Sequence, residues 1–379
     1  MNSSAEGNSQ PSRVEALDSA RGWAILGVIA IHVSQAAPLS QGILHALAIN
    51  GDMGVELFYV LSAFSLTMML HTRAMAGQHS LLGYFIRRFF RIAPMFWFAL
   101  ILATMVFFGK TSFWSPNGIG IADVALTAFF LHGIRPESIN SVIPGGWSVA
   151  VEVMFYLILP VFYKYAQTIV SALMWLLISV EIYFLFGSIA QSYFDQTLSA
   201  NAQHLSSIYS WYMSLPAQLP VFMMGILAFL LVKEGRWKPV YAYAAACVGG
   251  VMLLSIPIPA ENHVLPRHLL WGGIFAMFIV ANVQRPIFLF DNPLLRILGR
   301  ISYSAYLLHF FVLIYIGKIF SHLTIQAEYK FALLYFVVVG ITYFLASWSY
   351  RKIELPGMKI GSEFSRRFEV DSKKELYEK

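Results

Sequence analysis

Apolar segments separated by polar loops recur along the chain from about residue 18 to residue 350. A helix rises about 1.5 Å per residue, so roughly 20 consecutive apolar residues cross the hydrocarbon core of a bilayer. The pattern predicts ten such helices, at 18–37, 53–71, 91–109, 147–165, 168–189, 215–233, 239–257, 268–284, 302–320 and 331–350. A weaker apolar stretch at 121–134 would make eleven.

The distribution of basic residues favours ten crossings over eleven. With ten crossings and the N-terminus inside, most Lys and Arg residues fall on the inner side, together with the basic C-terminal segment. The outer loops at 37–52 and 190–214 then contain neither Lys nor Arg, and an eleventh crossing would scramble this pattern. We therefore predict an all-α, polytopic transmembrane helical bundle of about ten spans with cytoplasmic N- and C-termini. The stretch at 121–134 would be re-entrant or lie along the outer surface.

The composition agrees with this class and divides the chain into three parts. Of its residues 58% are hydrophobic and 12% are charged, about half the charged share of a soluble globular protein. We expect a disordered polar tail at 1–12, a transmembrane domain at 13–356 and a charged cytoplasmic tail at 357–379. The net charge of +6 comes from residues at the span ends, so topology explains it better than a nucleic-acid partner. Nothing in the sequence has the spacing of a structural metal site.

Two ionisable residues stand in the first apolar segment, in the sequence LDSARGWAILGVIAIHVSQ. Arg21 and His32 are eleven residues apart, and eleven steps of about 100° return to within about 20° of the starting direction. The two side chains therefore share one helix face and lie about 16 Å apart along the axis. This spacing predicts a guanidinium near the cytoplasmic surface and an imidazole near the bilayer midplane, where an ionisable group indicates a functional site. The alternative is that His32 only hydrogen-bonds a neighbouring helix.

Four further segments combine polar and apolar residues in a way that could carry chemistry. They are GDMGVELFYVLSAFSL with Glu56, YFIRRFFRIAP with Arg88 and Arg91, GGWSVAVEVMFYLILP with Trp147, Ser148 and Glu152, and LGRISYSAYLLH with Tyr303. Each also has a structural interpretation. Arg88 and Arg91 could be positive-inside anchors, and the two glutamates could face water near a span end. In the last segment Tyr303, Tyr306 and His309 are expected to serve as packing and interfacial residues.

Taken together, these segments resemble the acyltransferase-3 family of membrane-bound O-acyltransferases. The matching features are Arg21–x10–His32, GVELFYVLSAF, Arg88–x–x–Arg91, Ser148–x–x–x–Glu152 and LGRISYSAYLLH, in this order. The chain departs from the family pattern where Glu56 stands for a frequent Asp, Tyr59 for Phe and Ala63 for Gly. The first of these changes keeps the charge, and the other two are mild.

The resemblance implies transfer of an acyl group, usually acetyl, from acetyl-CoA or another acyl-CoA to a hydroxyl of a cell-envelope saccharide or other glycosylated acceptor. In this family chemistry Arg88 and Arg91, aided by Arg21, would bind donor phosphates, since arginine forks pair well with phosphate oxygens. His32 would act as general base and Glu152 would orient its imidazole. Supporting roles fall to Ser148, Trp147, Glu56 and Tyr303.

Three alternatives remain open at this point. In the first, an acyl-enzyme forms, with His32 or Ser148 carrying the acyl group to an outer-face acceptor. In the second, the protein is a transporter or flippase for a lipid-linked sugar, and its buried polar residues line the pathway. In the third, the protein is a membrane scaffold in which the same residues only hold helices together. Every one of these places the protein in the cell (inner or plasma) membrane, with the lipid bilayer as a partner.

Overall fold

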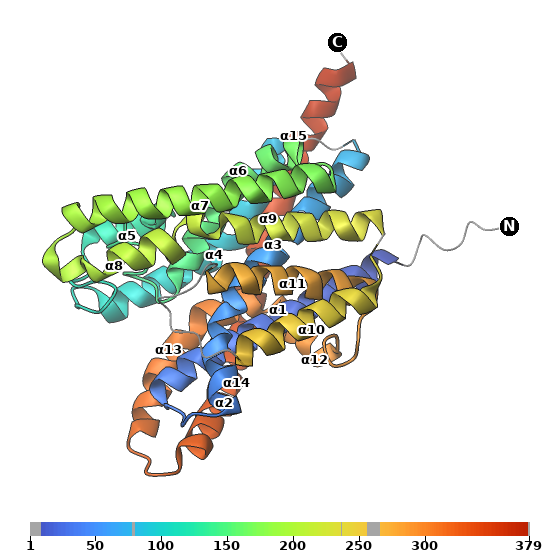
Figure 1. The fold of residues 1–379 in the computed structure, drawn as a ribbon. Helices are drawn as coiled ribbons and strands as arrows, with labels where there is room; N and C mark the ends of the chain where they lie inside the picture. Colours follow the sequence, from blue (N-terminus) through green and yellow to red (C-terminus); the bar gives the residue numbers. More distant parts are fainter. Residues whose placement is uncertain (1–8, 78–79, 236, 256–265, 378–379) are drawn as a thin grey trace. The chain divides into compact units, whose positions relative to one another are not determined.

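The protein is helical throughout the part that the structure describes (Figure 1). The computed structural model describes residues 9–77, 80–235, 237–255 and 266–377. Helix accounts for 82% of the chain and these ranges contain no β-strand. The all-α prediction is thus confirmed, whereas the cytoplasmic placement of the termini stays a prediction.

Eight helical segments within the described ranges are long and apolar enough to cross a membrane. They are Glu15–Ala36, Ile43–Met75, Leu81–Phe107, Gly146–Tyr165, Ile169–Thr197, His204–Glu234, Ser302–Ser321 and Ala327–Phe368. Each covers most or all of one predicted span. The remaining two predicted spans correspond to α10 (Pro239–Ser255) and α11 (Arg267–Gln284), which are not among the eight. The last two residues of the predicted span at 239–257 lie outside the described ranges.

The weak apolar stretch at 121–134 is not a spanning helix. Helix α5 (Ile121–Ala128) has eight residues, and only a 3₁₀ turn, η2 (His132–Ile134), follows it. Between them Phe130 has a φ of 60°, a left-handed conformation that bulky residues rarely adopt and that cannot continue a helix. The prediction that this stretch does not cross the membrane as a full span agrees with these short elements.

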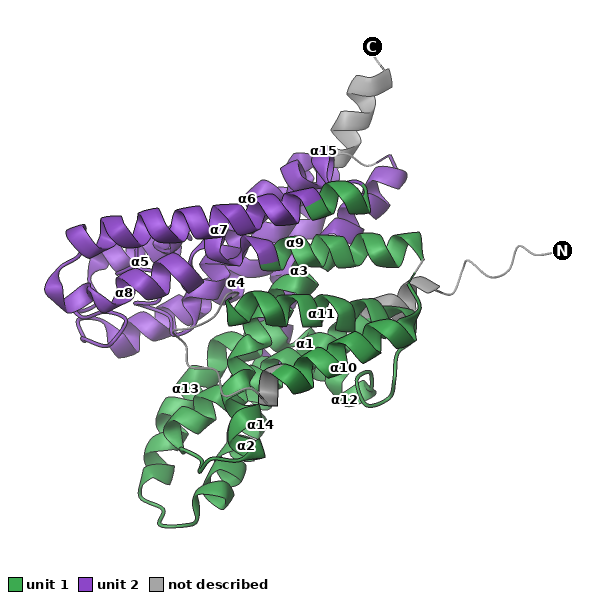
Figure 2. Ribbon diagram, viewed as in Figure 1, with its two compact units in different colours: residues 1–65, 168–173, 221–346 green, residues 66–167, 174–220, 347–379 purple. Residues whose placement is uncertain are grey.

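The chain folds into two compact units, which Figure 2 colours separately. Unit 1 contains residues 1–65, 168–173 and 221–346, and unit 2 contains residues 66–167, 174–220 and 347–379. The helices of unit 1 are α1 (Ser9–Ala36), α2 (Ile43–Ile49), η1 (Asn50–Met53), α10, α11, α12 (Pro293–Arg300) and α13 (Ser302–Ser321). Those of unit 2 are α4 (Leu81–Phe107), α5, η2, α6 (Gly146–Tyr165), η3 (Ala200–Ala202), α8 (His204–Ile208), η4 (Tyr209–Met213), η5 (Tyr350–Glu354) and α15 (Leu355–Tyr377). Both units contain residues of α3 (Gly54–Met75), α7 (Ile169–Thr197), α9 (Leu215–Glu234) and α14 (Ala327–Ser349).

In unit 1, helix α1 packs against its neighbours at unusually short backbone distances. A Cβ added at Gly299 of α12 would lie 1.7 Å from the carbonyl oxygen of Asp18, and one at Gly22 would lie 2.4 Å from that of Leu295. Only glycine permits such an approach, and small residues are the usual means by which helices come close in a membrane protein. The two glycines therefore fix α1 against α12 along the turns that carry Asp18 and Arg21.

In unit 2, helix α4 packs along α15. A Cβ added at Gly361 would lie 2.5 Å from Cβ of Phe90, and the Phe90 ring stacks on that of Phe364 with centroids 6.1 Å apart. Helix α4 begins at Leu81, ten residues before the predicted span, because the Ser80 hydroxyl caps it by accepting from the Gly83 amide. The basic residues of this segment thus lie inside the helix rather than before it.

Both predicted tails contain helix. Residues 9–12 belong to α1, whereas residues 1–8 of the predicted N-terminal tail lie outside the described ranges. The charged segment predicted at 357–379 is helical as far as Tyr377 in α15, and its last two residues are likewise outside.

Candidate active site

His32 lies on α1 with one ring nitrogen bound within the same helix. Its Nδ1 is 3.1 Å from Oε1 of Gln35, which lies three residues later. An amide oxygen only accepts hydrogen bonds, so Nδ1 carries the proton and Nε2 of the neutral ring carries the lone pair. This tautomer is the one that a general base acting through Nε2 requires. Gln35 is not among the predicted site residues, although the i, i+3 spacing on a helix could have indicated it.

Two aromatic side chains of α13 lie against the His32 ring. The centroid of the His309 ring is 5.4 Å away and that of Phe310 is 4.3 Å away. His309 is 0% exposed, and its Nδ1 is 2.6 Å from the carbonyl oxygen of Tyr306. His309 is thus fully buried beside the candidate base, which agrees with the packing role expected for it, while its depth in the membrane stays a prediction.

Arg21 bridges α1 and the middle of α3 within unit 1. Its Nη1 donates to the Asp18 carboxylate at 2.9 Å and its Nη2 donates to the Ser65 hydroxyl at 2.8 Å. Two of its five donors are thus engaged by the protein itself. This arrangement gives Arg21 a clear structural role, and its predicted role in donor binding rests on its remaining donors.

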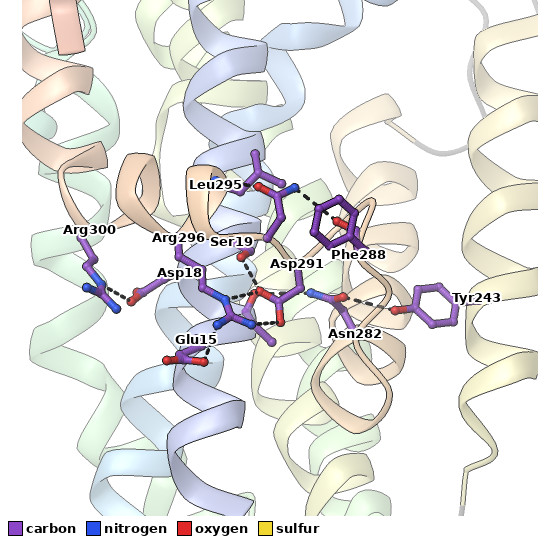
Figure 3. Close-up of polar contacts among 12 residues, drawn as sticks. Glu15, Asp18, Ser19, Tyr243, Asn282, Phe288, Asp291, Leu295, Arg296 and Arg300 are labelled. Atoms are coloured by element: carbon purple, nitrogen blue, oxygen red, sulfur yellow. Dashed lines mark hydrogen bonds and ion pairs between the residues drawn. The ribbon is translucent and has the colours of Figure 1, made fainter.

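A network of charges ties this end of α1 to the segment around α12 (Figure 3). Arg296 donates to Asp291 through Nε and Nη2, both at 2.7 Å, and to Glu15 through Nη1 at 2.6 Å. Ser19 donates to the same Asp291 carboxylate at 2.6 Å, and Asp291 is 6% exposed. Such bidentate arginine–carboxylate pairs are stronger and more directional than single contacts. In addition, Arg300 approaches Asp18 at 3.6 Å, so Asp18 pairs with two arginines.

This network predicts a loss of stability in acid. Hydrogen bonds from Arg296 lower the pKa of the Asp291 carboxyl, and the Ser19 hydroxyl adds to the effect. The stabilisation is therefore fully present above the unfolded pKa of about 3.9 and disappears as the pH falls through the folded pKa. We expect the difference in thermal midpoint between the wild type and Asp291→Asn, measured by tryptophan fluorescence in detergent, to be constant from about pH 5 to pH 8 and to shrink below about pH 4.

The matched control is Asp195→Asn, since Asp195 is exposed on α7. This variant should follow the wild type at every pH. A difference for Asp291→Asn that persisted undiminished at pH 3 would contradict the assignment of the ionised carboxylate as the stabilising form.

The two arginines of the Arg–x–x–Arg pair have different surroundings within unit 2. Arg91 forms an ion pair with Glu354 of the π-helical turn η5, whose side chain is 0% exposed. Arg88 has no carboxylate partner in the described part of the chain. Its Nη2 lies 3.9 Å from Sδ of Met69, and its buried Nε has no hydrogen-bond partner there. Arg91 is therefore tied to the fold, while Arg88 keeps donors for an anion.

The segment with Ser148 and Glu152 opens α6. Gly145, with a φ of 78°, supplies the left-handed turn before the helix, a conformation that favours glycine. The Ser148 hydroxyl donates to the carbonyl of Gly145 at 3.1 Å, and Tyr156 donates to the Glu152 carboxylate at 2.6 Å. The Trp147 ring lies 5.1 Å from that of Tyr212. Because Glu152 and His32 belong to different units, their predicted contact stays a prediction.

The two remaining predicted residues both lie in apolar helices. Glu56 is in the first turn of α3 and is 0% exposed, so within the chain it does not face solvent. Tyr303 is in the first turn of α13 and is half-buried. Their predicted supporting roles stay predictions.

A comparison with known families agrees with this arrangement of motifs. The model of the acyltransferase-3 family, described as an acyltransferase domain, matches residues 14–351, which contain every predicted site residue. The chain belongs to this family. No solved structure matches the chain.

Curated relatives are similar at low identity. The chain is 26% identical to a putative O-acetyltransferase of Staphylococcus aureus over 92% of its own length and 58% of that protein. It is 24% identical to the O-acetyltransferase OatA of the same species, over 93% of its own length and again 58% of the relative. It is also 24% identical to the acyltransferase MdmB of Streptomyces mycarofaciens, over 80% of each chain. The chain thus spans less than two thirds of the length of these staphylococcal proteins.

Proposed function

We propose that the protein is an integral O-acyltransferase of the cell membrane. It would move an acyl group, acetyl in the first instance, from acyl-CoA to a hydroxyl of a cell-envelope saccharide or glycosylated acceptor. The observation that carries the proposal is His32 on an apolar helix with Nδ1 bound to Gln35 and Nε2 available as a base. The names of the relatives, O-acetyltransferase in Staphylococcus and acyltransferase in Streptomyces, support the reaction class.

In the proposed reaction His32 moves one proton. Nε2 takes the proton of the acceptor hydroxyl while the hydroxyl oxygen attacks the thioester carbonyl. As the tetrahedral intermediate collapses, the C–S bond breaks and the C–O bond of the new ester remains. The imidazolium then returns the proton to the departing thiolate. Gln35 holds the required tautomer throughout, as the carboxylate does in a Ser-His-Asp triad.

Direct transfer is favoured over an acyl-serine intermediate. The Ser148 hydroxyl directs its proton to the carbonyl of Gly145, which is a weak base. A nucleophilic serine instead needs an adjacent general base that can remove this proton. In the proposed direct transfer Ser148 has a structural role, through its hydrogen bond at the start of α6.

Arg88 is the proposed anchor for the phosphates of the donor. Replacing Arg88 with alanine should raise the KM for acetyl-CoA about 10- to 100-fold, because a hydrogen bond to a charged group contributes about 1.5–3 kcal/mol. Replacing Arg91 should instead lower the thermal midpoint by a few degrees, since it removes the ion pair with the buried Glu354 carboxylate. Initial rates at varied acetyl-CoA and fluorescence-detected unfolding measure the two effects.

The double variant Arg91→Ala/Glu354→Gln is the control for this division of roles. It should be no less stable than Arg91→Ala alone, because the uncompensated buried charge is removed. Equal increases in the KM for acetyl-CoA in Arg88→Ala and Arg91→Ala would contradict the assignment of donor binding to Arg88 and of stability to Arg91.

Membranes that contain the protein, labelled acetyl-CoA and envelope glycans provide the test of function. The proposal expects label in an ester of the glycan, released by mild alkali. Movement of unmodified lipid-linked sugar across the membrane, without ester formation, would instead favour the transporter or flippase. If neither the ester nor the transported sugar is detected, the result would favour the membrane scaffold.

A further inference from the structure

His309 has one ring nitrogen that the protein leaves without a partner. Its Nδ1 lies 2.6 Å from the carbonyl oxygen of Tyr306, one turn earlier on α13. Because a carbonyl only accepts, Nδ1 carries the proton, and Nε2 of the neutral ring is a pure acceptor. This Nε2 is buried and receives no hydrogen bond in the described part of the chain.

Burying Nε2 of His309 without a hydrogen bond costs free energy, so the presence of an imidazole here needs an explanation. His309 is 0% exposed, so water does not compensate Nε2 as it would at a surface. Buried polar atoms are nearly always hydrogen-bonded, and an exception calls for a role. An aliphatic side chain would fill the same volume without this penalty, so packing does not account for an imidazole here.

The neighbours of His309 connect this nitrogen to the candidate base. The rings of His32 and His309 are 5.4 Å apart between centroids and tilted by 32°. Phe310 lies against both rings, with centroids 4.3 Å and 4.2 Å away. Helices α1 and α13 thus form a cluster of two imidazoles and one apolar ring, and each imidazole has its Nδ1 proton held by the protein.

We propose that Nε2 of His309 accepts a hydrogen bond from a second hydroxyl of the acceptor, next to the hydroxyl that reacts at His32. The inference rests on the proposed function and deepens it. An atom that only accepts selects a donor, so a hydroxyl fits this position, whereas a carboxylate, phosphate or carbonyl does not. A sugar presents neighbouring hydroxyls on an apolar ring, which matches two adjacent imidazoles beside Phe310. The site thus selects polyhydroxylated acceptors over simple alcohols.

Two substitutions separate the two nitrogens of His309. His309→Asn places an amide near Nδ1, where it can still donate to the carbonyl of Tyr306, but nothing reaches the position of Nε2. His309→Gln extends the amide towards Nε2, where its oxygen can accept. The readout is incorporation of label from acetyl-CoA at varied amounts of envelope glycan, with membranes containing the full chain as the enzyme.

For His309→Asn we expect the half-saturating amount of glycan to rise about tenfold, because one neutral hydrogen bond to the acceptor is lost. The KM for acetyl-CoA should stay unchanged. His309→Gln should restore part of the difference. The matched control is Thr342→Val, which removes another buried hydroxyl without a partner in the described part of unit 1 and should leave both constants unchanged.

The outcomes are distinguishable. An unchanged half-saturating amount of glycan in His309→Asn overturns the inference, and so does an equal rise for acetyl-CoA and glycan. A loss of stability alone would lower the rate at saturation without moving the half-saturating amount, and this result also overturns it. If the wild type forms no labelled ester at all, the proposed function itself fails.

Discussion

Replacing His32 with alanine is expected to lower the rate of acyl transfer at saturating substrates by about 10²- to 10⁴-fold, the usual contribution of a general base. The KM for acetyl-CoA should change little, because the ring meets the hydroxyl proton rather than the phosphates of the donor. Formation of labelled ester on the glycan, followed over time in membranes with equal amounts of protein, measures the effect.

Two further variants test whether the loss of rate is specific to His32 and its tautomer. Gln35→Leu should lower the rate by a smaller factor, since the base remains but its tautomer is no longer fixed. His204→Ala should retain full activity, because His204 is exposed on α8 in unit 2. Transfer that survives in His32→Ala would remove His32 from the chemistry and return it to helix packing.

Gly299→Ala is expected to destabilise the protein by about 3 kcal/mol or more, at the upper end of what overpacking costs. The added Cβ would lie 1.7 Å from the backbone oxygen of Asp18, and backbone cannot rotate away as a side chain can. Helices α1 and α12 must therefore separate, which also disturbs Asp18 between its two arginines. Thermal unfolding in detergent, followed by tryptophan fluorescence, measures the loss.

Gly340→Ala is the matched control for this substitution. Gly340 lies in α14 of unit 1, and an added Cβ there meets nothing within 4 Å. Its replacement should be neutral or stabilising by up to about 1 kcal/mol, because alanine is the better helix former. Equal thermal midpoints for Gly299→Ala and Gly340→Ala would show that the close approach of α1 and α12 is not needed for stability.

Periodicity and apolar length were sufficient to predict the helices, because both are local properties of the sequence. The same reasoning identified the stretch at 121–134 as exceptional, and there α5 ends at Ala128, two residues before the left-handed Phe130. Local patterns did not predict that α4 begins ten residues early or that the charged tail continues as α15. The early start of α4 depends on the Ser80 cap, and the continuation as α15 depends on its packing against the distant helix α4.

The same distinction applies to the candidate site. The shared face of Arg21 and His32 follows from helix geometry, whereas the partner of Arg91 lies 263 residues later in the chain. Similarly, the Asp291 that accepts from Ser19 is 272 residues away from it. Spacing along one helix carries no information about such pairs, so the sequence suggests candidate residues but not which of them bind one another.

The contact between His32 and Gln35 has a consequence for how substrates can reach the base. Both residues belong to one turn of α1, so the base and the group that fixes its proton move together. In a triad whose members come from separate chain segments, any opening of the site stretches the orienting bond. Here a movement of the neighbouring helices would leave the imidazole with the same protonation pattern, because both partners lie on α1. Readiness for the proposed proton transfer is thus a property of a single helix.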